Sequence, residues 1–199
     1  MMMSAIVIRS AYIFKRLGSI WYQEAKINAG DRAVKDYFGH SVDIDNNYAI
    51  IGSMNEDHNY TDQGSAYIFE RDGATWTQVA KIMANDRAAS YNFGCAVAID
   101  GNYAIDGNYA IVGSRYDDDN GSNSGSSYMF IHDGTNWTQE AKLTASDGQA
   151  SDYFGYAVSI QDDIAIVGAY YNVGVIFRVL KDGRWTEKNA IPLFMVIMI

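Results

Sequence analysis

Short runs of alternating apolar and polar residues fill most of this chain, and no long stretch keeps the period of a helix. Val42 and Ile44, for example, fall on one face of an extended strand, because side chains two residues apart point the same way. β-Branched and aromatic runs that are bounded by Gly, Asn and Asp predict strands. In one stretch of the chain these runs are residues 38–44 (FGHSVDI), 47–51 (NYAII), 65–70 (SAYIFE) and 75–82 (TWTQVAKI).

This group of four predicted strands recurs along the chain. Trp21, Trp76 and Trp137 each precede the next Phe-Gly pair by 17 residues. The repeating unit has 55 residues, and the middle copy is six residues longer because GNYAID is followed by GNYAIV. An insertion of even length keeps every strand residue on its original face, so the core pattern survives it. Four antiparallel strands in a repeat of this length predict the blade of a β-propeller.

The copies predict an all-β chain of four-stranded antiparallel blades in a single domain, residues 1–199. Three blades are expected at about residues 38–82, 93–143 and 154–188. A fourth would be split between residues 5–27, with three predicted strands, and the apolar run at residues 191–199. Pairing of these terminal strands would close a four-bladed ring and remove its exposed edges. The alternative is part of a larger propeller that another chain or further sequence completes.

Composition and charge argue against several classes of function. The formal net charge of −9 argues against nucleic-acid binding, which needs a basic surface. No apolar run reaches the about 20 residues of a membrane-spanning helix, and residues 1–10 show no secretory signal. Cys95 is the single cysteine, so no disulfide forms within the chain and a packing role is expected. The three histidines are not equivalent in the repeat and no catalytic motif accompanies them, so we predict a protein that is not an enzyme.

Phe-Gly pairs and glycines at fixed positions carry a family resemblance. The pairs begin at Phe38, Phe93 and Phe154, and the glycines that close the next apolar runs are Gly52, Gly113 and Gly168. Together with GSAYIF at residues 64–69, they resemble the FG-GAP repeat, which builds the β-propeller heads of integrin α-chains and of many surface proteins. The resemblance implies adhesion or binding at an extracellular or cell-surface location. The G-A-P proline and the calcium loop D-x-D-x-D-G are absent, so the chain is similar to the shorter bacterial variant.

Candidate ligand residues lie in the loops. In an antiparallel blade, the loop between strands two and three and the loop into the next blade emerge on the same side, here rich in Asp, Asn, Ser and Tyr. The candidate ligand-binding residues are Asp57, Tyr60, Asp62, Tyr116, Tyr170 and Tyr171. The tryptophans recur at one fixed position in each unit, which predicts packing and not ligand stacking.

An acidic run in the second of these loops offers a candidate metal site. Carboxylate and amide oxygens are the ligands that Ca²⁺ prefers. The candidate metal ligands are Asp117, Asp118, Asp119 and Asn120. The other interpretation is that these residues form turns, because Asp and Asn side chains bond their own backbone. We favour the turn, so no cofactor is expected, and Ca²⁺ is the alternative.

These features predict a non-catalytic binding or adhesion module that presents an acidic loop face to a protein or glycan ligand. One alternative is a structural subunit that self-associates through its terminal strands into an oligomer or filament. Another is a lectin-like sugar binder. No nucleic acid and no membrane insertion are expected.

Overall fold

A computed structural model of the chain describes residues 9–101, 108–162, 164–171, 175–181 and 184–188. Every regular element in these residues is a strand, as the alternating pattern predicts. Accordingly, the described residues contain no helix that is long and apolar enough to cross a membrane. The prediction of an all-β chain is confirmed.

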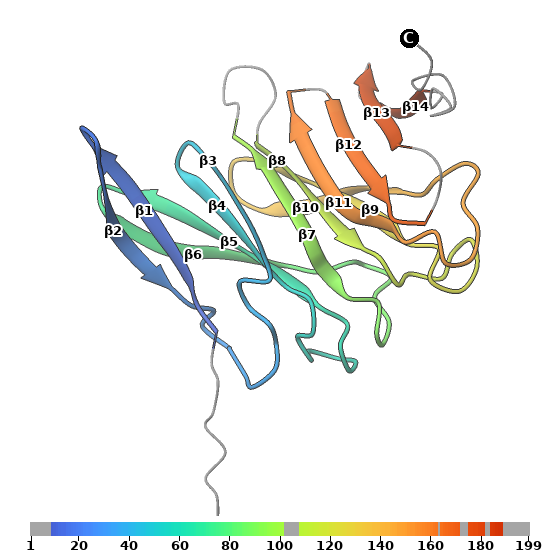
Figure 1. Ribbon diagram of the computed structural model, residues 1–199, viewed down its shortest axis with the longest axis horizontal. Helices are drawn as coiled ribbons and strands as arrows, with labels where there is room; N and C mark the ends of the chain where they lie inside the picture. Colours follow the sequence, from blue (N-terminus) through green and yellow to red (C-terminus); the bar gives the residue numbers. More distant parts are fainter. Residues whose placement is uncertain (1–8, 102–107, 163, 172–174, 182–183, 189–199) are drawn as a thin grey trace, which may run out of the picture.

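The strands form one two-stranded sheet and three four-stranded sheets, all antiparallel, in which sequence neighbours pair (Figure 1). The two-stranded sheet contains β1 (Ala11–Leu17) and β2 (Ile20–Ile27). The first full blade contains β3 (Ser41–Asp45), β4 (Tyr48–Ser53), β5 (Ser65–Asp72) and β6 (Thr75–Ile82). The second contains β7 (Phe93–Asp100), β8 (Asn108–Ser114), β9 (Ser126–His132) and β10 (Trp137–Leu143). The third contains β11 (Phe154–Gln161), β12 (Ile164–Ala169), β13 (Val175–Lys181) and β14 (Arg184–Lys188).

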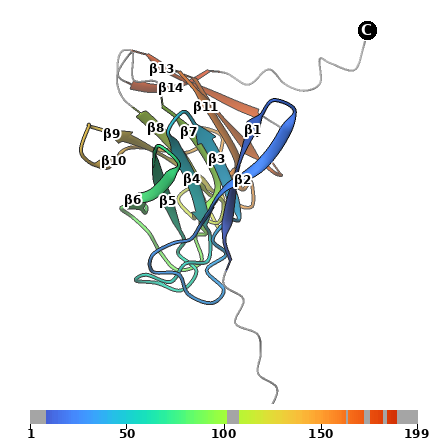
Figure 2. The same ribbon diagram turned by 90° about the vertical axis from the view of Figure 1, so that its left-hand side faces the viewer.

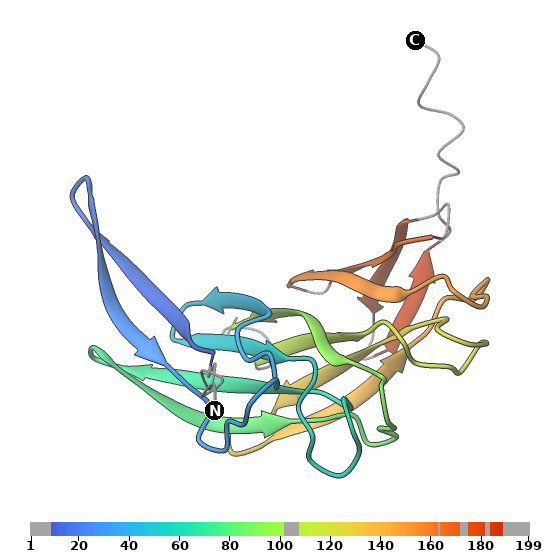
Figure 3. The same ribbon diagram turned by 60° about the horizontal axis from the view of Figure 1, so that its bottom comes forward.

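The four sheets lie side by side in chain order, as the blades of a propeller do. Figure 3 shows the β1–β2 sheet at one end of an arc and the third blade at the other end, and Figure 2 views the sheets from the β1–β2 end. The expected fourth blade would use residues 5–8 and 191–199, and both segments lie outside the described residues. Closure of the ring, and the single domain that it implies, therefore stay predictions.

The first strand of the first blade is shorter than expected. The sequence predicts a strand from residue 38, but β3 begins at Ser41. The backbone angles do not account for the difference, because the positive φ values of Tyr37 and Gly39 recur at Tyr153 and Gly155, where β11 begins at Phe154. In the later copies the equivalent Phe93 and Phe154 each form a bridge with a glycine of the preceding blade. The phenylalanine therefore begins the strand where a full blade precedes it.

The six-residue duplication falls in the connection between β7 and β8. Asp45 pairs with Tyr48 in the first blade, and the equivalent Asp100 pairs with Tyr109 in the second. Ile99 and Ala110, which flank the longer connection, are both buried. The added residues thus leave the facing of the flanking strands unchanged, as an insertion of even length should.

Apolar side chains fill the spaces between neighbouring sheets. One cluster joins the first and second blades through residues such as Ile50 and Val97, and another joins the second and third through Ile111 and Val167. A third cluster packs the β1–β2 sheet on the first blade. Each blade therefore stabilises the next by apolar burial, at roughly 25 cal/mol per Å².

The tryptophans follow this arrangement. Trp76 and Trp137 are partly buried and pack against the inter-blade clusters, as their fixed position predicts. Trp21 holds the same position in the β1–β2 sheet but is exposed, because no described sheet precedes it.

Candidate functional site

The two kinds of loop expected on one side of the blades contact each other there. In the first blade the N–H groups of Ser90 and Phe93 donate to the carbonyls of Thr61 and Gln63, at 2.8 and 2.9 Å. The second blade repeats the pattern, with Ser151 donating to Ser122 at 2.8 Å. Each loop between strands two and three is thereby fixed to the loop that enters the next blade. We call this surface the loop side.

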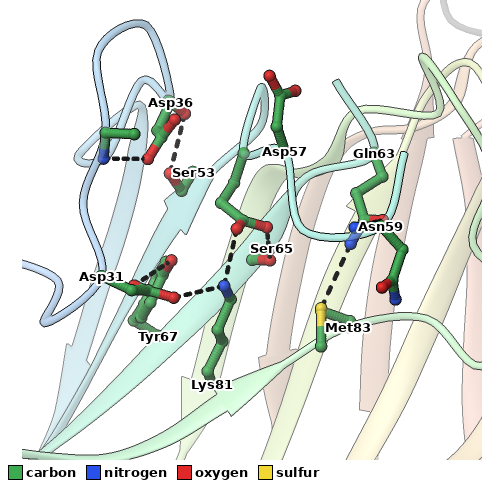
Figure 4. Close-up of polar contacts among 12 residues, drawn as sticks. Asp31, Asp36, Ser53, Asp57, Asn59, Gln63, Ser65, Tyr67, Lys81 and Met83 are labelled. Atoms are coloured by element: carbon green, nitrogen blue, oxygen red, sulfur yellow. Dashed lines mark hydrogen bonds and ion pairs between the residues drawn. The ribbon is translucent and has the colours of Figure 1, made fainter. Parts of the chain in front are cut away.

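A lysine stands at the centre of the first group of loop carboxylates (Figure 4). The Lys81 ammonium, on β6, lies 2.6 Å from the Asp31 carboxylate and 2.8 Å from the Glu56 carboxylate. The Tyr67 hydroxyl donates to Asp31 at 2.9 Å, and the Ser65 hydroxyl donates to Glu56 at 2.6 Å. Both acids of this cluster are therefore ion-paired and hydrogen-bonded within the chain.

The second blade contains the equivalent cluster with one more acid. The Lys142 ammonium, on β10, lies 2.6 Å from Asp86, 3.0 Å from Asp117 and 2.7 Å from Asp119. The Tyr128 hydroxyl donates to Asp117 at 2.7 Å, and Asp117 is fully buried. A carboxylate buried in this way needs both a counter-charge and hydrogen bonds, and the lysine and the tyrosine supply them.

The lysines change the ionisation of both clusters. Burial alone would raise the pKa of Asp31 and of Asp86, but the neighbouring ammonium and tyrosine hydroxyl outweigh it and lower the pKa of each. Burial would likewise lower the pKa of Lys142, yet its three carboxylate partners raise that pKa above the ordinary value. The charged forms of Asp31, Asp86 and Lys142 are thus favoured by their ion pairs.

The predicted metal ligands take separate roles in this arrangement. Asp117 and Asp119 do converge, with Asp86, to within 4.8 Å, but the Lys142 ammonium bonds to all three. The Asp118 carboxylate instead accepts from the Asn123 N–H, five residues on, at 2.6 Å. The Asp117 carboxylate accepts from the Asp119 N–H, two residues on, at 3.2 Å, as in an Asx turn. Asn120 donates to the Ala145 carbonyl at 3.2 Å. The geometry favours turn formation and internal charge pairing for this run.

We predict that millimolar Ca²⁺ leaves the melting temperature of the protein unchanged. A cation would have to displace the Lys142 ammonium, and the lysine is tethered to the site while the metal is not. Differential scanning fluorimetry with Ca²⁺, with Mg²⁺ as a control, measures this. A rise in melting temperature with Ca²⁺ alone would show that the carboxylates hold calcium in spite of the lysine.

Sequence reasoning missed the two lysines, although a signal was present. Lys26, Lys81 and Lys142 each stand five residues after the repeat tryptophan. Each ammonium also lies over a tyrosine ring of the preceding strand, at 5.3–5.5 Å from the ring centre. A cation repeated at one strand position, beside acids repeated in the adjoining loop, indicates an internal ion pair.

The predicted ligand residues of the first blade serve different purposes. The Asp57 carboxylate accepts from the Asp62 N–H at 2.6 Å and so closes the loop, in the same way as Asp118 in the second blade. Tyr60 is exposed on this loop, and its N–H donates to Gln63. These three candidates lie on one loop, but the structure assigns their contacts to loop closure.

The predicted tyrosines of the other blades come together. Tyr116 packs on Tyr153 at 5.5 Å between ring centres, and Tyr153 packs on Tyr171 at 5.4 Å. Tyr171 contacts Tyr170 at 4.7 Å, and Tyr170 stacks on Tyr156 at 4.8 Å. These five residues form a continuous aromatic surface, which we call the tyrosine cluster. Tyr153 precedes the third Phe-Gly pair and Tyr156 follows it, and the sequence alone did not single them out.

Arg115 adds a positive charge to the tyrosine cluster. Its guanidinium lies 4.8 Å from the centre of the Tyr116 ring and 5.7 Å from that of Tyr156, within the range of a cation–π contact. Tyr156, Tyr170 and Tyr171 are exposed. The nearby Cys95 is buried, and burial raises the pKa of its thiol, which agrees with a packing role.

Comparison with protein families decides what kind of chain this is. A family model described as the FG-GAP repeat matches residues 21–69, 76–130 and 137–176, which together are more than half of the chain. The chain belongs to the FG-GAP repeat family. A comparison with curated proteins found no significant match. FG-GAP repeats form β-propellers that generally mediate adhesion and protein binding.

The structure explains the glycines of the FG-GAP motif. A Cβ atom added at Gly52 would lie 2.1 Å from the Gly94 carbonyl oxygen, and one added at Gly113 would lie 2.0 Å from the Gly155 carbonyl oxygen. In each pair the first glycine closes β4 or β8, and the second belongs to the Phe-Gly pair of the next blade. The FG-GAP motif thus permits two backbones to touch where neighbouring blades meet.

Proposed function

We propose that this FG-GAP protein is a non-catalytic binding module that recognises a protein ligand through the tyrosine cluster and Arg115 on its loop side. The observation that carries the proposal is the continuous contact of five tyrosines, three of them exposed. Tyrosine and arginine are enriched among the residues that dominate protein–protein binding energy.

Internal pairing of the carboxylates supports this choice of surface. Asp31, Glu56, Asp86 and Asp117 are engaged by Lys81 and Lys142, so a ligand would have to break those ion pairs to use them. Glu56 and Asp117 are buried, and removing one partner of a buried ion pair costs about 3–5 kcal/mol. Exposed acids remain in the loops, such as Asp57 in the first blade and Asp118 in the second, and their negative charge on the loop side would favour a basic ligand.

Adhesion at a cell surface is the setting that the FG-GAP family suggests for such a module, and we propose it here. A glycan ligand is the second candidate function. The stacked pair Tyr156–Tyr170, with both rings exposed, offers an apolar face flanked by hydroxyls, as a sugar ring would require.

Selection of displayed peptides tests the protein-binding proposal. Peptides that bind the full chain are selected from a random phage-displayed library. Their binding to the double variant Tyr170→Ser/Tyr171→Ser is then measured. We expect the enriched peptides to bind the double variant about tenfold more weakly or worse, as loss of aromatic anchors predicts. Tyr22→Ser, an exposed tyrosine on β2, is the matched control and should bind normally.

Peptides that bind all three proteins equally would place the ligand site elsewhere and refute the proposal. A glycan array probed with the same proteins examines the second candidate. Binding of a glycan to the wild type and to Tyr22→Ser, but not to the double variant, would favour the lectin-like function over peptide recognition.

A further inference from the structure

The β1 strand has one free edge among the described strands. Among the residues that the structure describes, β1 pairs only with β2, whereas β5 and β9, which hold the same position in the full blades, pair on both sides. Figures 1 and 3 show β1 at the end of the arc, next to the first blade. An unpaired edge presents a row of backbone donors and acceptors that can bind another strand.

β1 is also nearly a copy of β5 in sequence. Residues 10–16 read SAYIFKR and residues 65–71 read SAYIFER, so one position of the seven differs. The strand that β5 binds on its inner edge is β4, with Ala49 opposite Phe69, Ile50 opposite Ile68 and Ile51 opposite Tyr67. The free edge of β1 therefore offers the surface that β5 uses to hold β4.

An apolar groove of about 500 Å³ runs beside this edge. Val42 and Ile44 of β3 line it and are 60% and 52% exposed. Their equivalents in the second blade, Val97 and Ile99, are only 7% and 3% exposed, because they pack against the cluster that contains Ile50 of β4. The groove thus lies where a strand equivalent to β4 would pair with β1, and the apolar side chains that such a strand would cover line it.

We propose that the β1 edge and this groove bind a β-strand of a second polypeptide that carries the β4 pattern, Asn-Tyr-Ala-Ile-Ile-Gly-Ser. In the register of the first blade, its alanine would lie opposite Phe14, the first isoleucine opposite Ile13 and the second opposite Tyr12. The first isoleucine would pack near Val42 and Ile44, since Ile50 belongs to the same core cluster as Val97 and Ile99. The partner that this site fits is another chain with repeats of this kind, joined by strand addition.

The proposal does not depend on the tyrosine cluster, since the groove and that cluster lie at different blades. A synthetic peptide with the sequence of residues 47–53 and a fluorescent label is titrated with the full chain, and fluorescence anisotropy reports binding. We expect saturable binding to the wild type. A peptide in which the residue equivalent to Ile50 is changed to lysine should bind at least about tenfold more weakly, because the lysine would meet the apolar groove.

Two variants of the chain complete the test. Val42→Lys places a charge in the groove and should weaken binding of the unchanged peptide by a similar factor. Leu17→Lys lies at the far end of β1, where Leu17 is also exposed to solvent, and should bind as the wild type does. Circular dichroism confirms that both variants remain folded. The proposal is overturned if the peptide does not bind the wild type, or if it binds Val42→Lys as tightly as the wild type.

Discussion

Replacement of Gly113 by alanine is expected to destabilise the protein by about 3 kcal/mol or more, because the new methyl group would overlap the backbone of the next blade. The Cβ atom would lie 2.0 Å from the Gly155 carbonyl oxygen, and backbone cannot rotate away as a side chain can. Gly113 is not among the residues with positive φ, so the whole effect is steric. Urea denaturation followed by circular dichroism measures the loss.

Gly30→Ala is the matched control for this substitution. The added Cβ would meet only the Gln78 side chain, at 3.7 Å, and Gly30 is exposed. A change below about 0.5 kcal/mol is expected there, as at most surface positions. If Gly113→Ala were as mild as Gly30→Ala, the blades would not meet at the glycines of the FG-GAP motif.

Replacement of Lys142 by methionine should cost about 3 kcal/mol at neutral pH, since it leaves a fully buried carboxylate and two others without their counter-charge. The three acids lie within 4.8 Å of one another and would then repel each other. Lys15→Met is the control, because Lys15 is half exposed and lies 3.7 Å from Glu24, so its loss should cost less than about 1 kcal/mol. Thermal unfolding of both variants measures the difference.

The pH dependence of this difference has a definite sign. The pKa of Asp86 is lowered in the folded wild type, so its pairing contributes stability above the ordinary carboxyl pKa and loses it as the pH falls through the folded value. The pKa of Lys142 is raised, so its contribution is complete below the ordinary lysine pKa and is lost only in strong alkali. The difference in unfolding free energy between the wild type and Lys142→Met should therefore become smaller below about pH 4. A gap that widened in acid would contradict the ion-pair account.

Much of the fold could be predicted from the sequence because its information is local and repeated. The alternation of apolar and polar residues predicted the strand positions. Residues 75–82, for example, coincide with β6. Equal spacing of the tryptophans and Phe-Gly pairs gave the blades. The late start of β3 was missed because it depends on the preceding blade, which is a neighbour in space.

The site was only partly predictable, because its chemistry depends on contacts between segments far apart in the sequence. The loop side and the residues Tyr116, Tyr170 and Tyr171 were among the candidates. The pairing of Lys142 with Asp86 joins residues that are 56 positions apart, so reading the loops alone left the acids without partners. The tyrosine cluster likewise needed Tyr153 and Tyr156, which belong to the entry of the third blade.

The most direct test of the central claim compares a tyrosine with an acid of the loop side. The affinity of a peptide selected on the wild-type chain is measured by calorimetry for Tyr171→Ser and for Asp118→Asn. We expect Tyr171→Ser to weaken binding about tenfold or more, as loss of an anchor does, and Asp118→Asn to leave the affinity nearly unchanged. Loss of affinity in Asp118→Asn with Tyr171→Ser unaffected would show that the acids, and not the tyrosines, bind the ligand.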